Sequence, residues 1–146
     1  MSLKKEQLEI SFDSARIDVV ETSRLMRETY WGAGRTLELD RVAFENSLCV
    51  AGYLDGKQVA FGRAITDCAL FAHISDILVW PEHRGRGFGV ALVEALLDHP
   101  TIANIPAISL NTADAHGLYE KFGFNRVADG MHMKRIRPLP STPGQG

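Results

Sequence analysis

The sequence predicts an α/β (α+β) fold in which a single mixed, mostly antiparallel sheet is flanked by helices. Strand-like segments at 48–54, 58–66 and 71–80 follow one another with short connections, and such neighbours pair as an antiparallel meander. Two later helical patterns alternate with strands, and a helix that crosses between two strands of one sheet makes those strands parallel. The two kinds of connection together predict one mixed sheet.

The N-terminal third is predicted to form one strand and two helices. Residues 8–13 alternate apolar and polar side chains, as a half-buried strand does. Apolar residues then recur at helical spacing over 17–30 and over 36–47, with Val20 and Val42 among those predicted to face inward.

The remaining elements are predicted from turn residues and periodicity. Asp55-Gly56 is a strong signal for a two-residue hairpin, Pro81 and Pro100 mark the end of a strand and of a helix, and Asp114 is the predicted N-cap of a later helix. After the meander we expect a helix over 87–99, a strand over 105–111, a helix over 114–122, and closing strands over 124–128 and 131–136.

Length and composition indicate one globular domain. A chain of 146 residues fits a single domain, predicted over 1–136, and the proline-rich tail 137–146 is predicted to be disordered. The net charge of −2 gives no reason to expect nucleic acid or an anionic membrane as a partner. No apolar run approaches the roughly 20 residues of a membrane span, so no membrane-spanning helix is expected.

Neither cysteine is predicted to have a catalytic, metal-binding or redox role. Cys49 and Cys68 form no metal-binding or redox motif, and their apolar, strand-like surroundings predict buried thiols. The N-terminus lacks the apolar stretch of a signal peptide. We therefore expect no metal and a cytoplasmic location.

The stretch RGRGFG, Arg84 to Gly89, follows a strand and opens a helix. Backbone N–H groups at a helix start attract anions, and the glycines at 85, 87 and 89 allow a ligand to approach the backbone closely. By itself the pattern also fits a glycine-rich turn with solvated arginines. It is neither a Walker P-loop nor a dinucleotide fingerprint, because the spacings of both are missing.

Two consecutive sequence motifs, of which this stretch is part of the first, make the predicted anion site more specific. The sequence DILVWPEHRGRGFGVALVEALL resembles the acetyl-CoA-binding motif of the GCN5-related N-acetyltransferase (GNAT) superfamily, and AHGLYEKFGF resembles the next motif of that family. The resemblance covers about 74–124. It implies the GNAT fold, with splayed central parallel strands, and acetyl-CoA as cofactor.

The resemblance also implies how acetyl-CoA is held. The pyrophosphate would bind to the backbone of Arg84, Gly85, Arg86, Gly87, Phe88 and Gly89. The pantetheine arm would lie along the free backbone groups of Ile77, Leu78 and Val79, on a strand that carries a bulge. An N–H near Leu78 or Val79 would stabilise the oxyanion during attack by the amine.

The family's A-x-x-x-Y pattern is matched by Ala115 and Tyr119, which implies that Tyr119 contacts the coenzyme and protonates the leaving thiolate. Packing of this tyrosine on its helix is the alternative. Many family members carry asparagine where this chain has Thr112, and a side-chain contact from the neighbouring Asn111 is not expected.

The proton acceptor for the amine has several candidates. Asp76 interrupts an apolar face attributed to Ile74, Leu78 and Trp80, which makes it the first candidate. A structural carboxylate, another acidic or histidine side chain such as His73, and a water relay remain alternatives.

The family fold places the loop between the first two helices over the acetyl end, so Tyr30, Trp31 and Arg35 are the predicted acceptor-binding residues. We expect an N-acetyltransferase acting on a small-molecule primary amine, with a homodimer implied by the resemblance. A non-catalytic acyl-CoA-binding or sensing module is the alternative.

Overall fold

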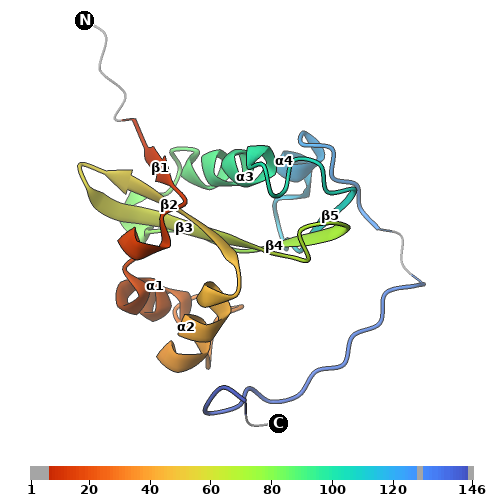
Figure 1. Cartoon of the computed structure of the whole chain (residues 1–146), viewed down its shortest axis with the longest axis horizontal. Helices are drawn as coiled ribbons and strands as arrows, with labels where there is room; N and C mark the ends of the chain where they lie inside the picture. Colours follow the sequence, from red (N-terminus) through yellow and green to blue (C-terminus); the bar gives the residue numbers. More distant parts are fainter. Residues whose placement is uncertain (1–6, 128–129, 145–146) are drawn as a thin grey trace, which may run out of the picture.

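The computed structural model describes residues 7–127 and 130–144 and contains a five-stranded mixed sheet (Figure 1). The order is β1-β2-β3-β4-β5, antiparallel throughout except for the parallel β4–β5 pair. The predicted fold class is confirmed. The strands are β1 (Glu9–Ser11), β2 (Leu48–Leu54), β3 (Lys57–Thr66), β4 (Phe71–Val79) and β5 (Ala107–Leu110).

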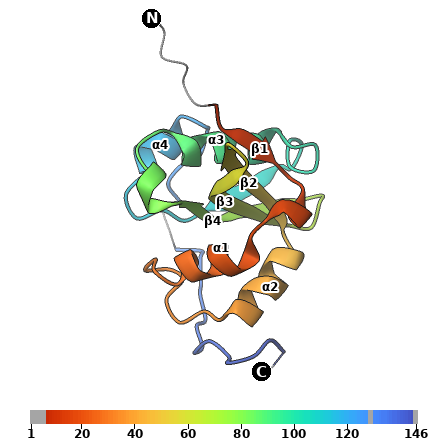
Figure 2. The ribbon, with the colours of Figure 1, turned by 90° about the vertical axis from the view of Figure 1, so that its left-hand side faces the viewer.

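Helices cover both faces of the sheet. In Figures 1 and 2, α1 and α2 lie on one face, and α3 and α4 lie on the other. Two short 3₁₀ turns, η1 (Ser14–Arg16) and η2 (Pro81–His83), precede α1 and α3. The four helices are α1 (Val19–Met26), α2 (Leu37–Glu45), α3 (Phe88–Asp98) and α4 (His116–Glu120).

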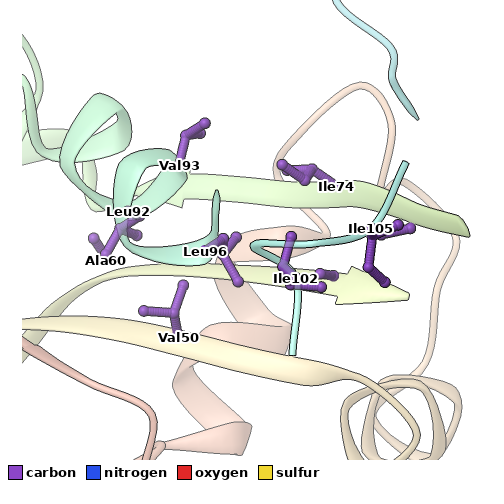
Figure 3. Packing of buried hydrophobic residues seen from close by; sticks show 10 residues of the cluster. Val50, Ala60, Ile74, Leu92, Val93, Leu96, Ile102 and Ile105 are labelled. Carbon is purple, nitrogen blue, oxygen red and sulfur yellow. The ribbon is translucent and has the colours of Figure 1, made fainter. Parts of the chain in front are cut away.

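Each face of the sheet has its own apolar core. On the α3 face, strand residues such as Val50 and Ile74 pack against Leu92 and Leu96 of α3, all at most 3% exposed (Figure 3). On the α1/α2 face, a second cluster contains Met26, Phe44, Phe61, Leu78 and Trp80. Each fully buried side chain of this size contributes about 1.5–3 kcal/mol, so the two cores hold the helices on the sheet.

Local signals account for most element boundaries. The side chains of Asp18 and Thr36 accept backbone hydrogen bonds at the starts of α1 and α2, as N-caps do. Asp55 and Gly56 both have positive φ angles, 48° and 76°, as the predicted two-residue hairpin requires. The meander strands therefore form where the sequence predicts them.

Three predicted burials are wrong. Val20 is 55% exposed and Val42 is 43% exposed, whereas Asp40 of α2 is 1% exposed. The carboxylate of Asp40 is paired with an arginine, so it can occupy an inward position. Cys68 is exposed in the loop between β3 and β4 and only Cys49 is buried, where burial raises the pKa of its thiol to about 11.

The C-terminal part departs most from prediction. The closing strands expected over 124–128 and 131–136 are not present in the described residues, and 128 lies outside them. A strand requires a partner, and among the described residues no strand pairs with the outer edge of β5. The last helix begins at His116 with Ala115, and not the predicted Asp114, as its N-cap, and no side chain caps it. The Thr112 hydroxyl accepts the Ala115 N–H just before the helix.

The described tail, 137–144, contains neither helix nor strand, and 145–146 lie outside the described residues. The domain bounds 1–136 and the disorder of the tail stay predictions. Within the part of the chain that the structure describes, no helix is long and apolar enough to cross a membrane.

Candidate functional site

The glycine loop, Arg84 to Gly89, follows η2 and includes the first two residues of α3. Gly85 and Gly87 have φ angles of 80° and 79°, and a Cβ added at either glycine would meet no atom within 4 Å. Glycine is therefore required for conformation, and the space beside the backbone is open. Gly87 is the N-cap of α3, where no side chain caps the helix and the first turn carries no acidic residue. The first amides of α3 are thus available to an anion.

The loop also lies close to β4. The Nε of Arg84 donates to the carbonyl oxygen of Val79 at 3.3 Å. A Cβ at Gly89 would lie 3.5 Å from Ile77 and 3.7 Å from Val79, so the first turn of α3 packs directly on this strand. The predicted anion site and the predicted pantetheine strand are therefore adjacent.

Strand β4 contains a bulge at Asp76. Phe61 of β3 pairs with Leu78 and Arg63 pairs with Ser75, so Gly62 alone faces both Asp76 and Ile77. Asp76 has a φ angle of 57°, the left-handed conformation typical of one form of bulge. The bulge implied by the family resemblance is present.

Because of the bulge, even-numbered side chains of β4 point to one face of the sheet before Asp76 and to the other face after it. Ile74 packs in the core beside α3, whereas Leu78 and Trp80 pack in the core beside α1 and α2. The prediction that these three residues share one apolar face is therefore wrong, because the extra residue shifts the alternation by one position. A Cβ at Gly62 would lie 2.5 Å from Ile77, so a larger residue opposite the bulge would require the bulge to move.

Beyond the bulge, β4 and β5 separate. Their parallel pairing ends at Ile74 and Leu110, while β4 continues to Val79. Alternate residues of a strand direct their backbone groups to opposite sides, so part of the backbone over 75–79 points away from β3. These groups are the ones predicted to contact the pantetheine arm.

A cavity of about 340 Å³ opens on the α1 side of this strand. Two of the predicted acceptor-binding residues, Tyr30 and Trp31, lie in its wall, and their rings meet edge to face with centroids 5.1 Å apart. Leu78 and Arg84 also line it, so the predicted cofactor strand and the glycine loop both reach the cavity. The remaining lining residues are Leu25, Glu28, Thr29 and Pro81.

Arg35 does not line this cavity but belongs to a buried charge network with Asp40, Arg63 and Asp76. Its guanidinium donates to both oxygens of Asp76, at 3.0 and 2.9 Å, and to Asp40 at 2.8 Å. The Nε of Arg63 donates to Asp76 at 2.7 Å. Both carboxylate side chains are 1% exposed, so they are nearly shielded from solvent, and the network balances two positive against two negative charges.

The network links four segments of the α1/α2 face. Arg35 lies in the loop between the helices, Asp40 in α2, Arg63 in β3 and Asp76 at the bulge of β4. The hydroxyl of Ser23, in α1, adds a hydrogen bond to Asp40 at 2.6 Å. The loop that carries Tyr30 and Trp31 is thus tied to the bulge by buried, charge-assisted hydrogen bonds.

The surroundings of Asp76 act on its pKa in opposite directions. Burial raises the pKa, but the hydrogen bonds from Arg35 and the positive charges of Arg63 and Arg35 outweigh burial, and the net shift is downward. The carboxylate is therefore ionised at neutral pH and held by two guanidinium groups. Its role as proton acceptor stays a prediction, which must now account for oxygens that are already hydrogen-bonded.

His73 lies near the point where β4 and β5 separate. Its Nδ1 is 2.7 Å from the Ser109 hydroxyl oxygen, and burial followed by the charge of Arg63 lowers the pKa of the imidazole. A neutral imidazole can accept a proton at neutral pH. The structure therefore keeps His73 as a second candidate for the proton acceptor.

Tyr119 lies on α4, on the other side of the sheet from the cavity. Its half-buried ring packs against the core beside α3 and meets Phe124 edge to face, with centroids 6.1 Å apart. Burial, followed by the charge of Asp114, raises the pKa of the phenol. Tyr119 is therefore a protonated donor at neutral pH, and its contact with the coenzyme stays a prediction.

Sequence reasoning missed the partners of Asp76 and one cavity residue. Arg63 and Asp40 are charged residues inside apolar strand and helix patterns, the same signal that marked Asp76. Glu28 lies at the start of the loop between α1 and α2, and its place in the cavity wall had no such signal. Over 7–127 and 130–144, no group of three or more His, Cys, Asp or Glu side chains could hold a metal ion.

Comparisons with known proteins agree on one family. Residues 45–126, more than half of the chain, match the family described as "Acetyltransferase (GNAT) domain". A crystal structure from Xanthomonas campestris pv. campestris, assigned to the GNAT family of acetyltransferases, is 40% identical with a TM-score of 0.85 and covers 90% of this chain and 94% of its own.

Two further proteins extend the comparison. The "uncharacterized N-acetyltransferase ycf52" of Pyropia yezoensis is 28% identical over 79% of this chain and 69% of its own length. An acetyltransferase from Clostridium acetobutylicum, whose structure contains acetyl-CoA, has a TM-score of 0.66 at 15% identity over 88% of this chain and 96% of its own. The latter similarity concerns the fold alone.

Proposed function

The chain belongs to the GNAT family of acetyltransferases, and from this premise we propose that it transfers acetyl from acetyl-CoA to the primary amine of a small molecule. The attack would be direct, in a ternary complex. The observation that carries the proposal is that Leu78 and Arg84 each belong both to the predicted cofactor site and to the cavity wall. The proposed anion site and the proposed acceptor cavity therefore meet at one bulged strand.

The residues present fit coenzyme A. Two glycines with positive φ and an uncapped helix start offer several N–H groups to a pyrophosphate, and Arg84 and Arg86 add positive charge near them. The backbone of Ile77, Leu78 and Val79 would bind the pantetheine arm. Acetyl-CoA, when bound, supplies the acetyl group as a reactive thioester.

Each proposed step uses groups of this chain. The backbone N–H of Leu78 or Val79 would donate to the carbonyl oxygen on which negative charge develops. Tyr119 would return a proton to the departing sulfur. Asp76 is the proposed proton acceptor for the amine, with His73 or a water relay as alternatives.

The acceptor is proposed to be small. A cavity of about 340 Å³ lies at the lower end of the range for small-molecule sites. The rings of Tyr30 and Trp31 suit an ammonium group or the apolar body of an amine, and the Glu28 carboxylate adds negative charge to the wall. Arg35 stays a proposed acceptor contact, although its guanidinium is held by Asp40 and Asp76.

Turnover can be measured as release of free thiol from acetyl-CoA in the presence of amines, polyamines, amino acids and peptides. We expect release with at least one small amine and none without an acceptor. Binding of acetyl-CoA without turnover on any acceptor would instead favour the acyl-CoA-sensing alternative.

Replacing Gly87 with valine is expected to weaken acetyl-CoA binding by about tenfold or more. The φ angle of 79° costs a residue with a Cβ roughly 1–2 kcal/mol, so the loop must change shape or store strain. Isothermal titration calorimetry measures the affinity. Gly56→Val is the matched control, because it introduces the same strain in the β2–β3 hairpin, and it should leave the affinity unchanged. A Gly87→Val protein that binds as tightly as wild type would contradict the proposed cradle.

A cytoplasmic location and a homodimer are also part of the proposal. Cys49 and Cys68 are both free thiols, as is usual in a reducing compartment. The homodimer rests on the family resemblance of the sequence.

A further inference from the structure

Asp76 holds the bulge of β4 in a backbone conformation that few side chains adopt. Its φ angle is 57°, and Asp76 and Ile77 together lie opposite Gly62. A non-glycine residue with positive φ persists only where its surroundings constrain it. Backbone pairing with β3 does not supply that constraint, because the extra residue of a bulge is unpaired. The constraint therefore comes from the hydrogen bonds of the Asp76 side chain.

The two cations that bind Asp76 differ in how firmly their own backbone is held. Arg35 lies in the loop between α1 and α2. Arg63 lies in β3, where its backbone pairs with Cys49 of β2 on one side and with Ser75 of β4 on the other. A residue in the middle of a sheet is a more rigid support than a residue in a loop. Arg63 is thus the anchor of Asp76 on the sheet.

The guanidinium of Arg63 is itself held at two points. Its Nε donates to Oδ2 of Asp76 at 2.7 Å, and its Nη1 donates to the Ser47 hydroxyl oxygen at 3.0 Å. That hydroxyl donates its own hydrogen to the Ala43 carbonyl oxygen at 2.7 Å, which leaves its lone pairs available to Arg63. A planar guanidinium bonded through two of its nitrogens is fixed in orientation. Arg63 therefore sets the place of the Asp76 carboxylate and does not merely balance its charge.

We propose that Arg63 is a positioning residue for acetyl transfer: through Asp76 it fixes the bulge, and so directs the backbone over 77–79 toward the coenzyme. Arg63 is not among the residues that line the cavity, so it acts through Asp76 rather than on the acceptor. The inference deepens the proposed function and rests on it, because the coenzyme strand belongs to that site. It holds whichever group accepts the proton of the amine.

A purely structural role of Arg63 predicts a different result. Without this cation, two buried carboxylates share one guanidinium, which lowers the stability of the domain under either role. A purely structural residue would then change hydrogen exchange throughout the domain and leave the affinity for acetyl-CoA unchanged. A positioning residue changes exchange at the bulge in particular, and it changes how the coenzyme binds there.

Arg63→Met is expected to weaken acetyl-CoA binding by about tenfold or more in calorimetry. Binding of 3′-phosphoadenosine 5′-diphosphate, the nucleotide half of coenzyme A without the pantetheine arm, should change by less than about twofold, because the glycine loop is untouched. Ser47→Ala removes one of the two hydrogen bonds of the guanidinium and no charge. It should weaken acetyl-CoA binding by about threefold.

Ile102→Val is the matched control, because it removes one methyl group from the core beside α3 and lowers stability without touching the network. It should bind both probes as wild type does. Unchanged affinity for acetyl-CoA in Arg63→Met and Ser47→Ala would overturn the proposal, and so would an equal loss of affinity for both probes. If Arg63→Met does not fold, Ser47→Ala alone decides.

Hydrogen exchange of the ligand-free proteins tests the positioning without any reaction. In Arg63→Met and Ser47→Ala, amides over 76–80 should exchange several-fold faster than in wild type, relative to amides of α3. Equal acceleration over 76–80 and α3 would mean a purely structural role and would overturn the proposal. If wild-type protein binds no acetyl-CoA, the proposed function fails, and the exchange pattern still decides whether Arg63 fixes the bulge.

Discussion

Tyr119→Phe is expected to lower kcat by about 10²-fold or more while the affinity for acetyl-CoA stays nearly unchanged. The substitution removes one hydroxyl and keeps the ring, which packs against Phe124 and the core beside α3. The phenol is protonated at neutral pH because burial raises its pKa, so the variant loses a proton donor rather than a charge. Steady-state kinetics and calorimetric binding of acetyl-CoA separate the two effects.

Tyr53→Phe is the matched control for this experiment. Tyr53 is also a buried tyrosine whose pKa is raised by burial, but its hydroxyl donates to the Arg16 carbonyl at 2.9 Å, away from the cavity. It should lose about 1 kcal/mol of stability and keep its kcat. If Tyr119→Phe keeps the wild-type kcat under conditions where chemistry limits the rate, Tyr119 is not the acid.

Asp76→Ala is expected to lower the free energy of unfolding by about 3–5 kcal/mol. The substitution leaves the guanidinium groups of Arg35 and Arg63, 15% and 12% exposed, without their shared partner. It also puts alanine at a φ angle of 57°, which aspartate tolerates better. Urea titration measures the loss. Glu9→Ala is the matched control, because Glu9 pairs with Arg16 in the same two-pronged way on the surface, and it should change stability little.

The contribution of Asp76 depends on pH in a direction that its pKa sets. The folded-state pKa lies below the ordinary aspartate value of about 3.9, so the stabilisation is complete above that value and is lost as the pH falls through the lower folded-state pKa. The difference in stability between wild type and Asp76→Ala should therefore narrow in strong acid. A difference that is constant down to pH 2 would mean that folding does not lower the pKa of Asp76.

Asp76→Asn tests whether Asp76 accepts the proton of the amine. Asparagine removes the negative charge but keeps the size of the side chain and tolerates positive φ. If Asp76 accepts the proton of the amine, the folded Asn variant loses activity and the corresponding limb of its kcat/KM profile. A folded Asn variant that stays active would move the role to His73 or to a water relay, and His73→Gln then distinguishes these two.

Local patterns predicted most of the secondary structure. The strand-like segments over 48–54 and 71–80, the Asp55-Gly56 turn and the glycines of the Arg84–Gly89 loop are properties of neighbouring residues, and the structure has a strand, hairpin or loop at each of them. The family resemblance rested on the same kind of local signal. The closing strands failed because a strand depends on a partner, which a local pattern does not contain.

The residues of the candidate site also divide into those whose place the local sequence predicted and those whose place it did not. Tyr30 and Trp31 were predicted from their place in the loop, and both line the cavity. Arg35 was predicted from the same loop, and its side chain pairs with carboxylates from α2 and β4, so its contact with the acceptor stays a prediction. The sequence marked Asp76 as an unusual polar residue in an apolar strand without indicating which cations would surround it.

By itself, the sequence determined the family, the order of elements as far as α4 and the glycine loop, because these depend on residue type and spacing along the chain. The tertiary structure alone decided the position of the bulge at Asp76, which turns Leu78 toward α1, the burial of Asp76 between Arg35 and Arg63, and the position of β5 at an edge of the sheet. Each of these is a pairing between residues far apart in sequence. Its free energy comes from contacts that exist only once the sheet and its helices have come together.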